Sequence, residues 1–589
     1  MPAIITSKFR FHNAEQFKES FSEAAPTNYY MFIGRPSAFA SSGTNPETLT
    51  GGSDSAPPTP VDARKTEAYH WDDMLAAKKI DATGVTHAIP RRDLDISGST
   101  TYDMYRPDYS ATKTATSGAT SLFDSSFYFM TSAYRVYKVL DNAVNGTAAA
   151  WSGSEGTPTS TSASPFTTGN YTIKYMFTLS TTQVQNFLTP DFIAAPTAAE
   201  SGIALAAGRI DVVKITNEGS SSGVTQNADI TVYNVPIRGD GSGALCSVVI
   251  GGVTDSSNTG QVKSVAITAN GSGYTHATIL AADIKEQFDL QAGSSQVITW
   301  GNPSPVFEVI IPADGGHGSN PAKELGGHFA MMDVKLQQTE TFDFSVVNDF
   351  RQIGILRNPY SYGTTSAYTS TSARQTYAVK LSGSPGAFKV DEKISQALAT
   401  PTVSGITVSG STLTVTTSAA HGFATGQLVT IAAGTFAGGA TTGHRGTHYI
   451  TVTSTTQFTY AVGTQRTPTG SMSGTATCVP KSPQGIVVEY DASNKILFYI
   501  QTPYTDQGTN STGEKLPFSG TATITGAEST ATGVPDTSYG SALNNTSFTA
   551  GYSNPEMQPD SGDIIYMENR KPISRASDQT EDIKLIVEF

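Results

Sequence analysis

The chain has 589 residues and a formal net charge of −13, and only 15% of its residues are charged. An acidic chain repels the phosphate backbone of nucleic acids, so the charge argues against a nucleic-acid partner. The 25 Tyr and 27 Phe supply bulky core material, which argues against a disordered chain, and the length indicates several domains.

The two cysteines, Cys246 and Cys478, are too few and too far apart for a disulfide framework or a zinc pattern. We expect two free thiols in a reducing compartment. No apolar run approaches the roughly 18 residues that span a bilayer, and the first residues lack the basic and apolar regions of a secretory signal. These features predict no membrane association and a protein that is made and folded in a cytoplasm.

The first 80 residues predict a strand, a helix, a strand and a second helix. The first strand is expected over 4–11, and Asn13 is the expected N-cap of the helix that follows. Residues 29–33 are apolar and rich in aromatics, which indicates a buried strand. Apolar residues recur at roughly helical spacing over 70–80, so this stretch is expected to be helical.

A polar turn with two arginines follows. Arg91 and Arg92 could form a basic binding site, but Asp93 and Asp95 flank them. A solvated ion-pair cluster is therefore the preferred interpretation, and surface pairs of that kind contribute only about 0–1 kcal/mol.

Three tyrosines, Tyr102, Tyr105 and Tyr109, lie among aspartates in the segment TTYDMYRPDYS. Because tyrosine rings can stack on sugar rings, the segment is a candidate glycan-binding loop. The alternative is a packed loop whose hydroxyls hydrogen-bond the backbone. We favour the packed loop, because Tyr is found where one end of the side chain is apolar and the other is wet.

Aromatic and β-branched stretches predict strands over 127–140 and 171–179, and Ser180 is the expected N-cap of a short helix. An internal repeat then begins, in which GRIDVVKITNEG at 208–219 aligns with GQVKSVAITANG at 260–271. Each copy predicts a strand that ends in a glycine turn, and the pair predicts a stacked β unit. No GxxxxGK[ST] motif is present, so we do not interpret these glycines as a phosphate loop.

The segment 308–337 predicts a strand, a glycine loop, one helical turn and a second strand. Pro312 ends the first strand because it donates no ladder hydrogen bond. Asn320 followed by Pro321 predicts an N-cap and a first helical residue, and residues 328–336 predict the second strand.

Four residues of this segment lie close together in sequence and could bind a metal or exchange a proton: Asp314, His317, Glu324 and His328. A metal site needs His or carboxylate ligands that converge on one point, but this spacing matches no motif with an attached mechanism. We therefore favour a rigid loop whose histidines hydrogen-bond the backbone. We predict no metal, no cofactor and no catalytic residue here.

A second β module is expected over 403–478, where Thr alternates with Val, Ile and Leu in the clearest period-two pattern of the chain. His421 lies between two of its strands and could be a ligand. No second His or Cys stands at metal spacing, so a turn histidine is the preferred interpretation.

The C-terminal region predicts a hairpin over 486–501, a strand over 563–567, a charged turn over 568–575 and a final strand over 583–589. A terminal strand exposes an adhesive edge unless it is paired. We therefore expect the last strand to pair within the body or with a partner subunit.

The run IIPADGGHGSNPAKELGGHFAMM resembles the corresponding segment of baseplate wedge subunit 8 of T-even-like contractile-tailed phages, especially the longer cyanophage forms. Other segments resemble the same family in the same order: MPAIITSKFRFHNAEQF, YYMFIGRP, WDDMLAAKKI, TTYDMYRPDYS, FYFMTSAYRVYKVLDN, YTIKYMFTLSTTQVQNFLTPDFIA and GDIIYMENRKPISRASDQTEDIKLIVEF. The segments SGYTHATIL and HGFATGQLVTI resemble small β modules that recur in phage tail and structural proteins.

The resemblance implies a homodimeric structural subunit of the tail baseplate, which contacts other wedge subunits and takes part in the rearrangement that triggers sheath contraction. It also implies a protein of the virion that is synthesised and assembled in the host cytoplasm, and it brings no catalytic residues to this chain. The two inserts and the long Ser/Thr/Gly loops depart from the shorter T-even form.

These observations predict a mainly β fold with short helices, of the α+β class, in which a multi-domain body carries two inserted small β modules. The expected parts are an N-terminal part of the body at 1–207, a glycine-rich β repeat module at 208–285, a central part of the body at 286–402, a small β module at 403–478 and a C-terminal part of the body at 479–589.

Two other function classes remain open. A receptor- or glycan-binding tail protein would use the Tyr102–Tyr109 loop or the 403–478 module. A capsule depolymerase would need two carboxylates across a cleft, and nothing in the sequence selects a pair. No Cys stands beside an obvious His, and we predict a non-enzymatic protein with no small-molecule substrate.

Overall fold

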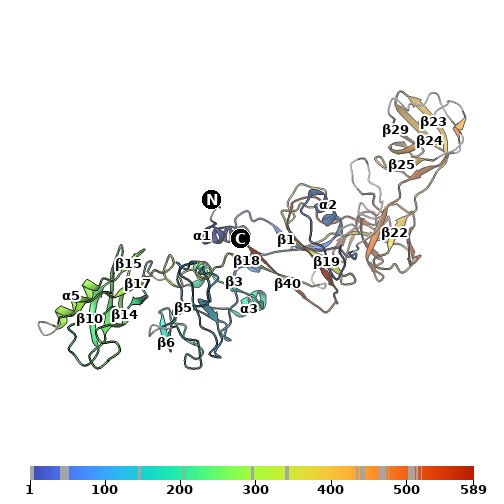
Figure 1. The fold of residues 1–589 in the computed structure, drawn as a ribbon. Coiled ribbons are helices and arrows are strands. Elements are labelled where there is room, and N and C mark those ends of the chain that lie inside the picture. The colour runs from blue at the N-terminus through green and yellow to red at the C-terminus, as the bar shows by residue number, and fades with distance from the viewer. Residues whose placement is uncertain are drawn as a thin grey trace. The chain divides into compact units, whose positions relative to one another are not determined.

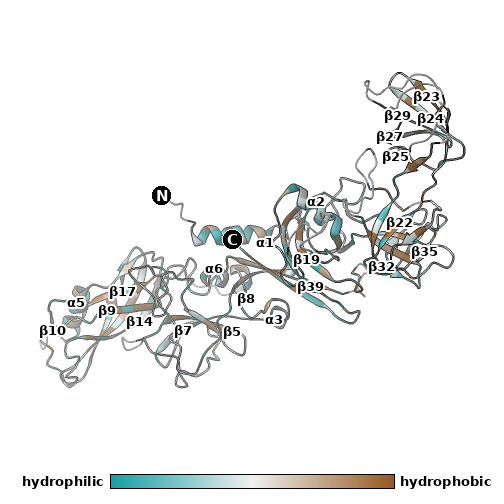
Figure 2. Cartoon of the chain, turned by 45° about the vertical axis from the view of Figure 1, so that its right-hand side comes forward, coloured by the Kyte–Doolittle hydropathy of each residue, from teal (hydrophilic) through white to brown (hydrophobic). Residues whose placement is uncertain are grey.

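The computed structural model describes residues 5–39, 52–143, 148–202, 206–292, 297–337, 344–432, 436–437, 445–462, 473–474, 476–501, 511, 515–518 and 520–589. Within these ranges the chain is mainly β with short helices, which confirms the predicted fold class. Hydrophobic residues are concentrated within the strands, whereas helix α1, Ser7–Glu19, is largely hydrophilic (Figure 2). None of the helices in these ranges is long and apolar enough to cross a membrane.

The chain divides into two compact units, each built from segments that are distant in sequence (Figure 1). Met1–Glu23, Ala82–Asp333 and Lys584–Phe589 make the first unit. Ala24–Asp81 and Val334–Ile583 make the second unit. The two units are described separately below.

Two four-stranded antiparallel sheets form the body of the first unit. One has the order β40-β18-β3-β8, with β40 at Glu581–Glu588, β18 at Phe329–Leu336, β3 at Val85–Pro90 and β8 at Phe192–Ala195. The other has the order β4-β5-β7-β6, with β4 at Tyr128–Met130, β5 at Arg135–Asp141, β7 at Tyr171–Thr178 and β6 at Phe166–Thr168. Aromatic rings fill the core between these elements, with Trp151, Tyr137 and Phe129 almost fully buried.

The sheets of the repeat module in the first unit include a two-stranded sheet and a three-stranded sheet. In the first, β9, Val212–Asn217, pairs with β17, Val306–Ile310. In the second, β13, Ser242–Ile250, lies between β11, Ile230–Pro236, and β14, Val262–Ser272. Helix α5, Ala281–Ala292, adds Ile284 and Phe288 to the module's apolar core.

The two repeat copies bond one another reciprocally. The N–H of Ile210 donates to the carbonyl of Asn270 (2.9 Å), and the N–H of Val262 donates to the carbonyl of Glu218 (3.0 Å). These donors occupy equivalent positions in the two copies, as do the acceptors. Four equivalent glycines have φ between 60° and 73°, a region that disfavours side chains: Gly208, Gly219, Gly260 and Gly271. The repeat seen in the sequence is therefore also a repeat of backbone conformation.

A five-stranded sheet with the order β20-β2-β1-β19-β39 lies at the centre of the second unit. Its strands are β20 at Ser372–Arg374, β2 at Met74–Lys79, β1 at Tyr29–Gly34, β19 at Phe350–Arg357 and β39 at Asp563–Ile573. Every residue of β1 is buried, which confirms the buried strand predicted over 29–33.

A seven-stranded sheet and the Thr-rich module complete the second unit. The sheet has the order β35-β34-β22-β32-β33-β21-β38, with bounds Thr532–Gly533, Ile524–Gly526, Lys393–Gln396, Gln484–Asp491, Ile496–Ile500, Tyr377–Lys380 and Tyr552–Ser553. The pairing of β32 with β33 confirms the predicted hairpin. The module contains β23 at Val403–Ser409, β24 at Thr412–Thr417, β29 at Gln457–Ala461 and β28 at Thr451–Ser454 in one sheet, and β27 at Gly446–Tyr449, β25 at Leu428–Ile431 and β31 at Cys478–Pro480 in another.

Two predictions near the N-terminus are wrong. The strand expected over 4–11 is the start of helix α1, whose N-cap is Thr6 rather than Asn13; the Thr6 hydroxyl accepts from the Phe9 N–H. The helix expected over 70–80 ends earlier, because α2 spans Arg64–Asp73 and β2 follows at once. Met74–Ala77 are buried between two neighbouring strands, so sheet pairing overrides the helical spacing.

Two later elements also differ from the predictions. The strand expected over 127–140 is two strands, β4 and β5, joined by a turn in which Tyr134 has φ 58°. The charged turn expected over 568–575 is instead largely strand, because β39 continues to Ile573. β39 tolerates these charged residues because it lies at the edge of its sheet and its side chains are partly or fully exposed.

Candidate functional site

The glycine-rich segment folds as its sequence predicts. Strand β17 precedes the loop, helix α6 spans Pro321–Glu324, and β18 follows. The Asn320 side chain accepts from the Lys323 N–H (3.1 Å), and Pro321 stands at the first helical position, which confirms the predicted cap. The left-handed conformation of Gly315 and Gly316 turns the chain back toward α6.

A buried ion pair joins this loop to the body sheet. The Lys138 ammonium of β5 donates to the Glu324 carboxylate, and both side chains are at most 1% exposed. The same carboxylate accepts from the backbone N–H groups of Gly318 (2.8 Å) and Asn320 (3.1 Å). Burial lowers the pKa of Lys138, and Glu324 opposes that change. Three donors therefore offset the cost of burying this carboxylate, and the Gly318 N–H is shared between its two oxygens.

His317 lies beside this pair and is fully buried. Its ring meets the Tyr105 ring edge-on with centroids 5.2 Å apart, and neither ring nitrogen has a hydrogen-bond partner. The prediction that this histidine side chain hydrogen-bonds the backbone is therefore wrong. Burial and the cations of Lys138 and Lys174 hold the pKa of His317 well below its usual value, so the ring is neutral near pH 7.

The burial of His317 is expected to make the stability of the first unit depend on pH. Its pKa is depressed in the folded state, so the unfolded chain binds the proton first as the pH falls below about 6.5. Folding stability is fully present above that pH and falls on acidification. The free energy of unfolding is expected to fall less between pH 6.5 and pH 4.5 when His317 is replaced with Phe. The difference is about 1.4 kcal/mol per pH unit at most.

Urea unfolding at several pH values checks this expectation, with Trp151 as the only tryptophan after Trp71→Phe and Trp300→Phe. Trp151 is buried in the first unit and therefore reports its unfolding. His12 is exposed, and its replacement with Phe is the control, which should leave the pH dependence of the free energy of unfolding unchanged. An equal pH dependence in the His317 variant and the parent protein would contradict the proposed role of His317.

The other two candidates of the segment lie apart from this cluster. His328 is 3.7 Å from Glu588, and burial lowers its pKa. Asp314 is exposed and pairs with Lys323 (3.4 Å) and Lys8 (3.6 Å), which lower its pKa. In the part of the chain that the structure describes, no three His, Cys, Asp or Glu side chains are grouped to hold a metal ion.

Two of the three tyrosines of the candidate glycan loop are buried, and Tyr109 is partly buried. Tyr102 and Tyr105 are 3% and 4% exposed, so their rings offer no surface to a sugar. The Tyr102 hydroxyl accepts from the Asp95 N–H (2.8 Å), and the Tyr109 hydroxyl donates to the Met104 carbonyl (2.9 Å). This is the packed loop that the sequence favoured.

The arginine turn differs partly from the prediction. Arg91 pairs with Asp93 (2.9 Å) as expected. Arg92 instead lies over the Tyr128 ring, 5.3 Å from its centroid, and donates to the Phe123 carbonyl. Asp95 accepts from Ser97 and Thr100 rather than from an arginine. A single surface ion pair beside a cation–π contact replaces the predicted four-residue cluster.

His421 is a structural turn histidine. Its Nδ1 accepts from the Phe423 N–H (2.9 Å), so Nε2 carries the proton and donates to the Ser454 carbonyl (3.0 Å). Both cysteines are buried free thiols, as predicted, and burial raises the pKa of each to about 12. Neither thiol is therefore reactive near neutral pH.

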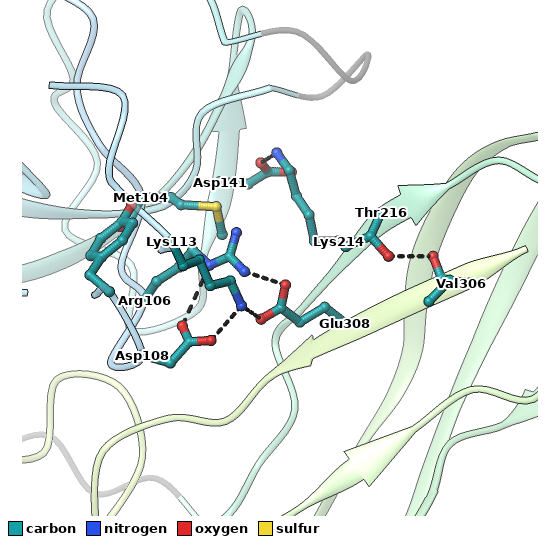
Figure 3. A network of polar contacts seen from close by, with 10 residues as sticks. Met104, Arg106, Asp108, Lys113, Asp141, Lys214, Thr216, Val306 and Glu308 are labelled. Carbon is teal, nitrogen blue, oxygen red and sulfur yellow. Dashed lines mark hydrogen bonds and ion pairs between the residues drawn. The ribbon is translucent and has the colours of Figure 1, made fainter. Parts of the chain in front are cut away.

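Ion pairs fasten the repeat module to the body of the first unit (Figure 3). Glu308 of β17 accepts from Arg106 of the tyrosine loop and from Lys113 (2.5 Å), which follows that loop. Lys214 of β9 donates to Asp141 of β5 (3.0 Å). Val212 and Ile310 also join the aromatic core of the body. Charge and apolar packing together hold the module in place.

Two buried lysines near the glycine-rich loop were not among the candidates chosen from the sequence. Lys138 and Lys174 are fully buried in β5 and β7. Burial lowers the pKa of Lys174 to about 8. The available signal was a lysine inside an otherwise apolar aromatic strand, in VYKVL and TIKYM. No sequence pattern pairs Lys138 with Glu324, because the two residues are 186 positions apart.

Comparison with known proteins identifies the C-terminal part of the chain. Residues 537–589 match the family model described as Bacteriophage T4, Gp8. No curated protein matches the chain. The matched segment contains β38, β39 and β40, so it supplies a strand to three of the sheets described above. The match covers residues 537–589 alone, and it supports a relationship between this segment and the baseplate wedge family of T4-like phages.

Proposed function

We propose that this protein is a homodimeric structural subunit of a contractile phage tail baseplate wedge. In this role it links other wedge subunits and takes part in the rearrangement that triggers sheath contraction. The observation that carries the proposal is where residues 537–589, which match the family model and are called the family segment below, lie in the sheets. Strands β38, β39 and β40 are each the outermost strand of their sheet in the described chain. An outer strand is where a neighbouring subunit can add its own backbone.

The remaining chemistry supports a mechanical role. The buried polar groups of the glycine-rich loop serve packing, and Glu308 and Lys214 fasten one part of the first unit to another. A wedge subunit needs rigid parts that withstand load, and permanent interfaces of such assemblies bury several thousand Å2 in general. The proposal therefore contains no catalytic step, cofactor or small-molecule substrate.

We also propose the five-part organisation expected from the sequence, with one boundary moved. The apolar core of the repeat module includes Phe288, Ile298 and Phe307. Since β17 pairs with β9 within the same module, the module extends to about Ile311. The body then resumes at the glycine-rich loop.

Two measurements test the proposed function. Mass spectrometry and a density map of purified virions should find the chain at the baseplate, with two copies side by side in each wedge. Light scattering of the purified protein should give twice the chain mass. Absence from virions, or a location only at fibre tips, would refute the structural role, and a monomeric mass would refute the dimer alone.

A further inference from the structure

The two repeat copies leave an opening between their strands. β9 pairs only with β17, and β14 pairs only with β13, so each of the two strands has one edge without a partner strand in the described chain. A groove of about 1030 Å3 follows these edges and is lined by every residue of β9 and by residues 263–267 of β14. The opening lies wholly within the first unit.

Hydrogen bonds close this opening at both ends. The N–H of Ile210 donates to the Asn270 carbonyl at one end, and the N–H of Val262 donates to the Glu218 carbonyl at the other. The two strands therefore run antiparallel to each other. Between these ends, the described structure contains no backbone hydrogen bond from one strand to the other. The backbone N–H and C=O groups that point into the opening thus have no strand to bond.

Side-chain contacts anchor the two strands to different parts of the first unit. Val212 of β9 packs in the aromatic core of the body, and Lys214 donates to Asp141 of β5 (3.0 Å; Figure 3). Lys263 of β14 instead pairs with Asp255 of the repeat module (2.6 Å). β9 is therefore held by the body and β14 by its own module, which accounts for the missing ladder between them.

An extended peptide segment fits this opening because both of its walls are strand edges. A backbone in β conformation presents N–H and C=O groups on both of its sides, so it can bond two edges at once. Its insertion would join the sheets β17-β9 and β14-β13-β11 into one six-stranded sheet. The closed ends limit the paired part to about five residues, a length of about 17 Å.

Apolar residues along the opening indicate which side chains the segment carries. Val213 and Ile215 of β9, with Val265 and Ile267 of β14, belong to the apolar core of the module or pack against it. Because side chains alternate along a strand, every second residue of the segment meets this core. β-branched apolar residues suit these positions. The residues between them face the groove, where Thr or Ser stays solvated.

We propose that the opening binds an extended segment of another protein, which inserts as a strand between β9 and β14. The segment alternates β-branched apolar residues with Thr or Ser over about five positions. Main-chain hydrogen bonds to both edges supply the affinity, and the alternate apolar side chains supply the specificity. This site does not depend on the proposed baseplate role, and it gives the subunit a point of attachment for a partner chain.

Hydrogen exchange of the full-length protein, followed by mass spectrometry, tests the proposal. The probe is the peptide acetyl-Lys-Thr-Val-Thr-Val-Thr-Lys-amide at up to about 1 mM, a concentration at which weak binding is detected. It should slow amide exchange in residues 212–217 and 263–267 by about tenfold or more. Strands β23 and β24 of the Thr-rich module are the internal control and should be unchanged. Protection of one edge alone, or of neither, would overturn the proposal.

A methylated peptide separates backbone pairing from apolar contact. N-methylation of both valines of the probe keeps its side chains but removes the N–H donors from one of its edges. Calorimetry should show binding weaker by about tenfold or more. Equal affinity of the two peptides would mean that the backbone does not pair, and the proposed insertion would then be wrong.

A cysteine pair across the opening provides a matched test in the protein. Thr216→Cys with Ser264→Cys places one thiol on each strand, at positions that line the groove. A disulfide holds the two Cα atoms about 4.4–6.8 Å apart, whereas an inserted strand needs about 9.6 Å between its neighbours. The oxidised variant should bind the probe at least about tenfold more weakly than the same protein after reduction. Equal binding in both forms would contradict the site and leave the baseplate proposal intact.

Discussion

Replacing Glu324 with Ala is expected to lower the free energy of unfolding of the first unit by about 3–5 kcal/mol. The substitution removes the charge that compensates the Lys138 ammonium, which is 0% exposed. It also leaves the Gly318 and Asn320 N–H groups without their acceptor. The uncompensated lysine must then lose its proton or draw water into the core, and both outcomes oppose folding.

Urea unfolding in the background with Trp151 as the single tryptophan measures this loss. Asp289→Ala is the control, because it breaks a partly exposed ion pair with Lys285 on α5 and should cost about 0.5 kcal/mol or less. The double variant Lys138→Met, Glu324→Met removes both charges and should recover part of the stability that the single variant loses. A cost for Glu324→Ala no larger than that of the control would show that the pair is not structural.

Local patterns in the sequence predicted the elements whose structure depends on local chemistry. The caps at Ser180 and Asn320 are examples, since each side chain accepts a backbone N–H three residues on. The period-two pattern of the Thr-rich module is another, because its apolar residues alternate into one core. Parts of that module lie outside the described residues, and the prediction is confirmed for the strands given above.

Elements that depend on distant partners could not be predicted in the same way. β2 has helical spacing, but its burial between β20 and β1 decides its conformation. β39 continues through charged residues because β19 pairs with it as far as Ile573. The same limit applies to the candidate site. Its four candidate residues are close together in the sequence, namely Asp314, His317, Glu324 and His328. Only His317 and Glu324 lie in the buried cluster with Lys138.

Replacing Gly354 with Val is expected to destabilise the second unit by about 3 kcal/mol or more. Gly354 lies in β19, opposite Phe32 of β1 and beside β39 of the family segment. A Cβ at this position would lie 2.4 Å from the Phe32 ring and 2.7 Å from the Tyr566 carbonyl oxygen. Neither neighbour can move freely, because the Phe32 ring is fully buried and the carbonyl is part of the β39 backbone.

Urea unfolding with Trp71 as the single tryptophan measures this effect, because Trp71 packs in the same apolar cluster as Phe32. The control is Gly540→Val in the same unit, where a Cβ meets nothing within 4 Å, so its cost should stay within about 0.5 kcal/mol. Since β39 belongs to the matched segment, Gly354→Val should also reduce incorporation of the chain into virions. Normal stability in this variant would mean that β19 and β39 do not pack as described. Normal incorporation despite a large loss of stability would mean that the family segment binds the baseplate without its own sheet.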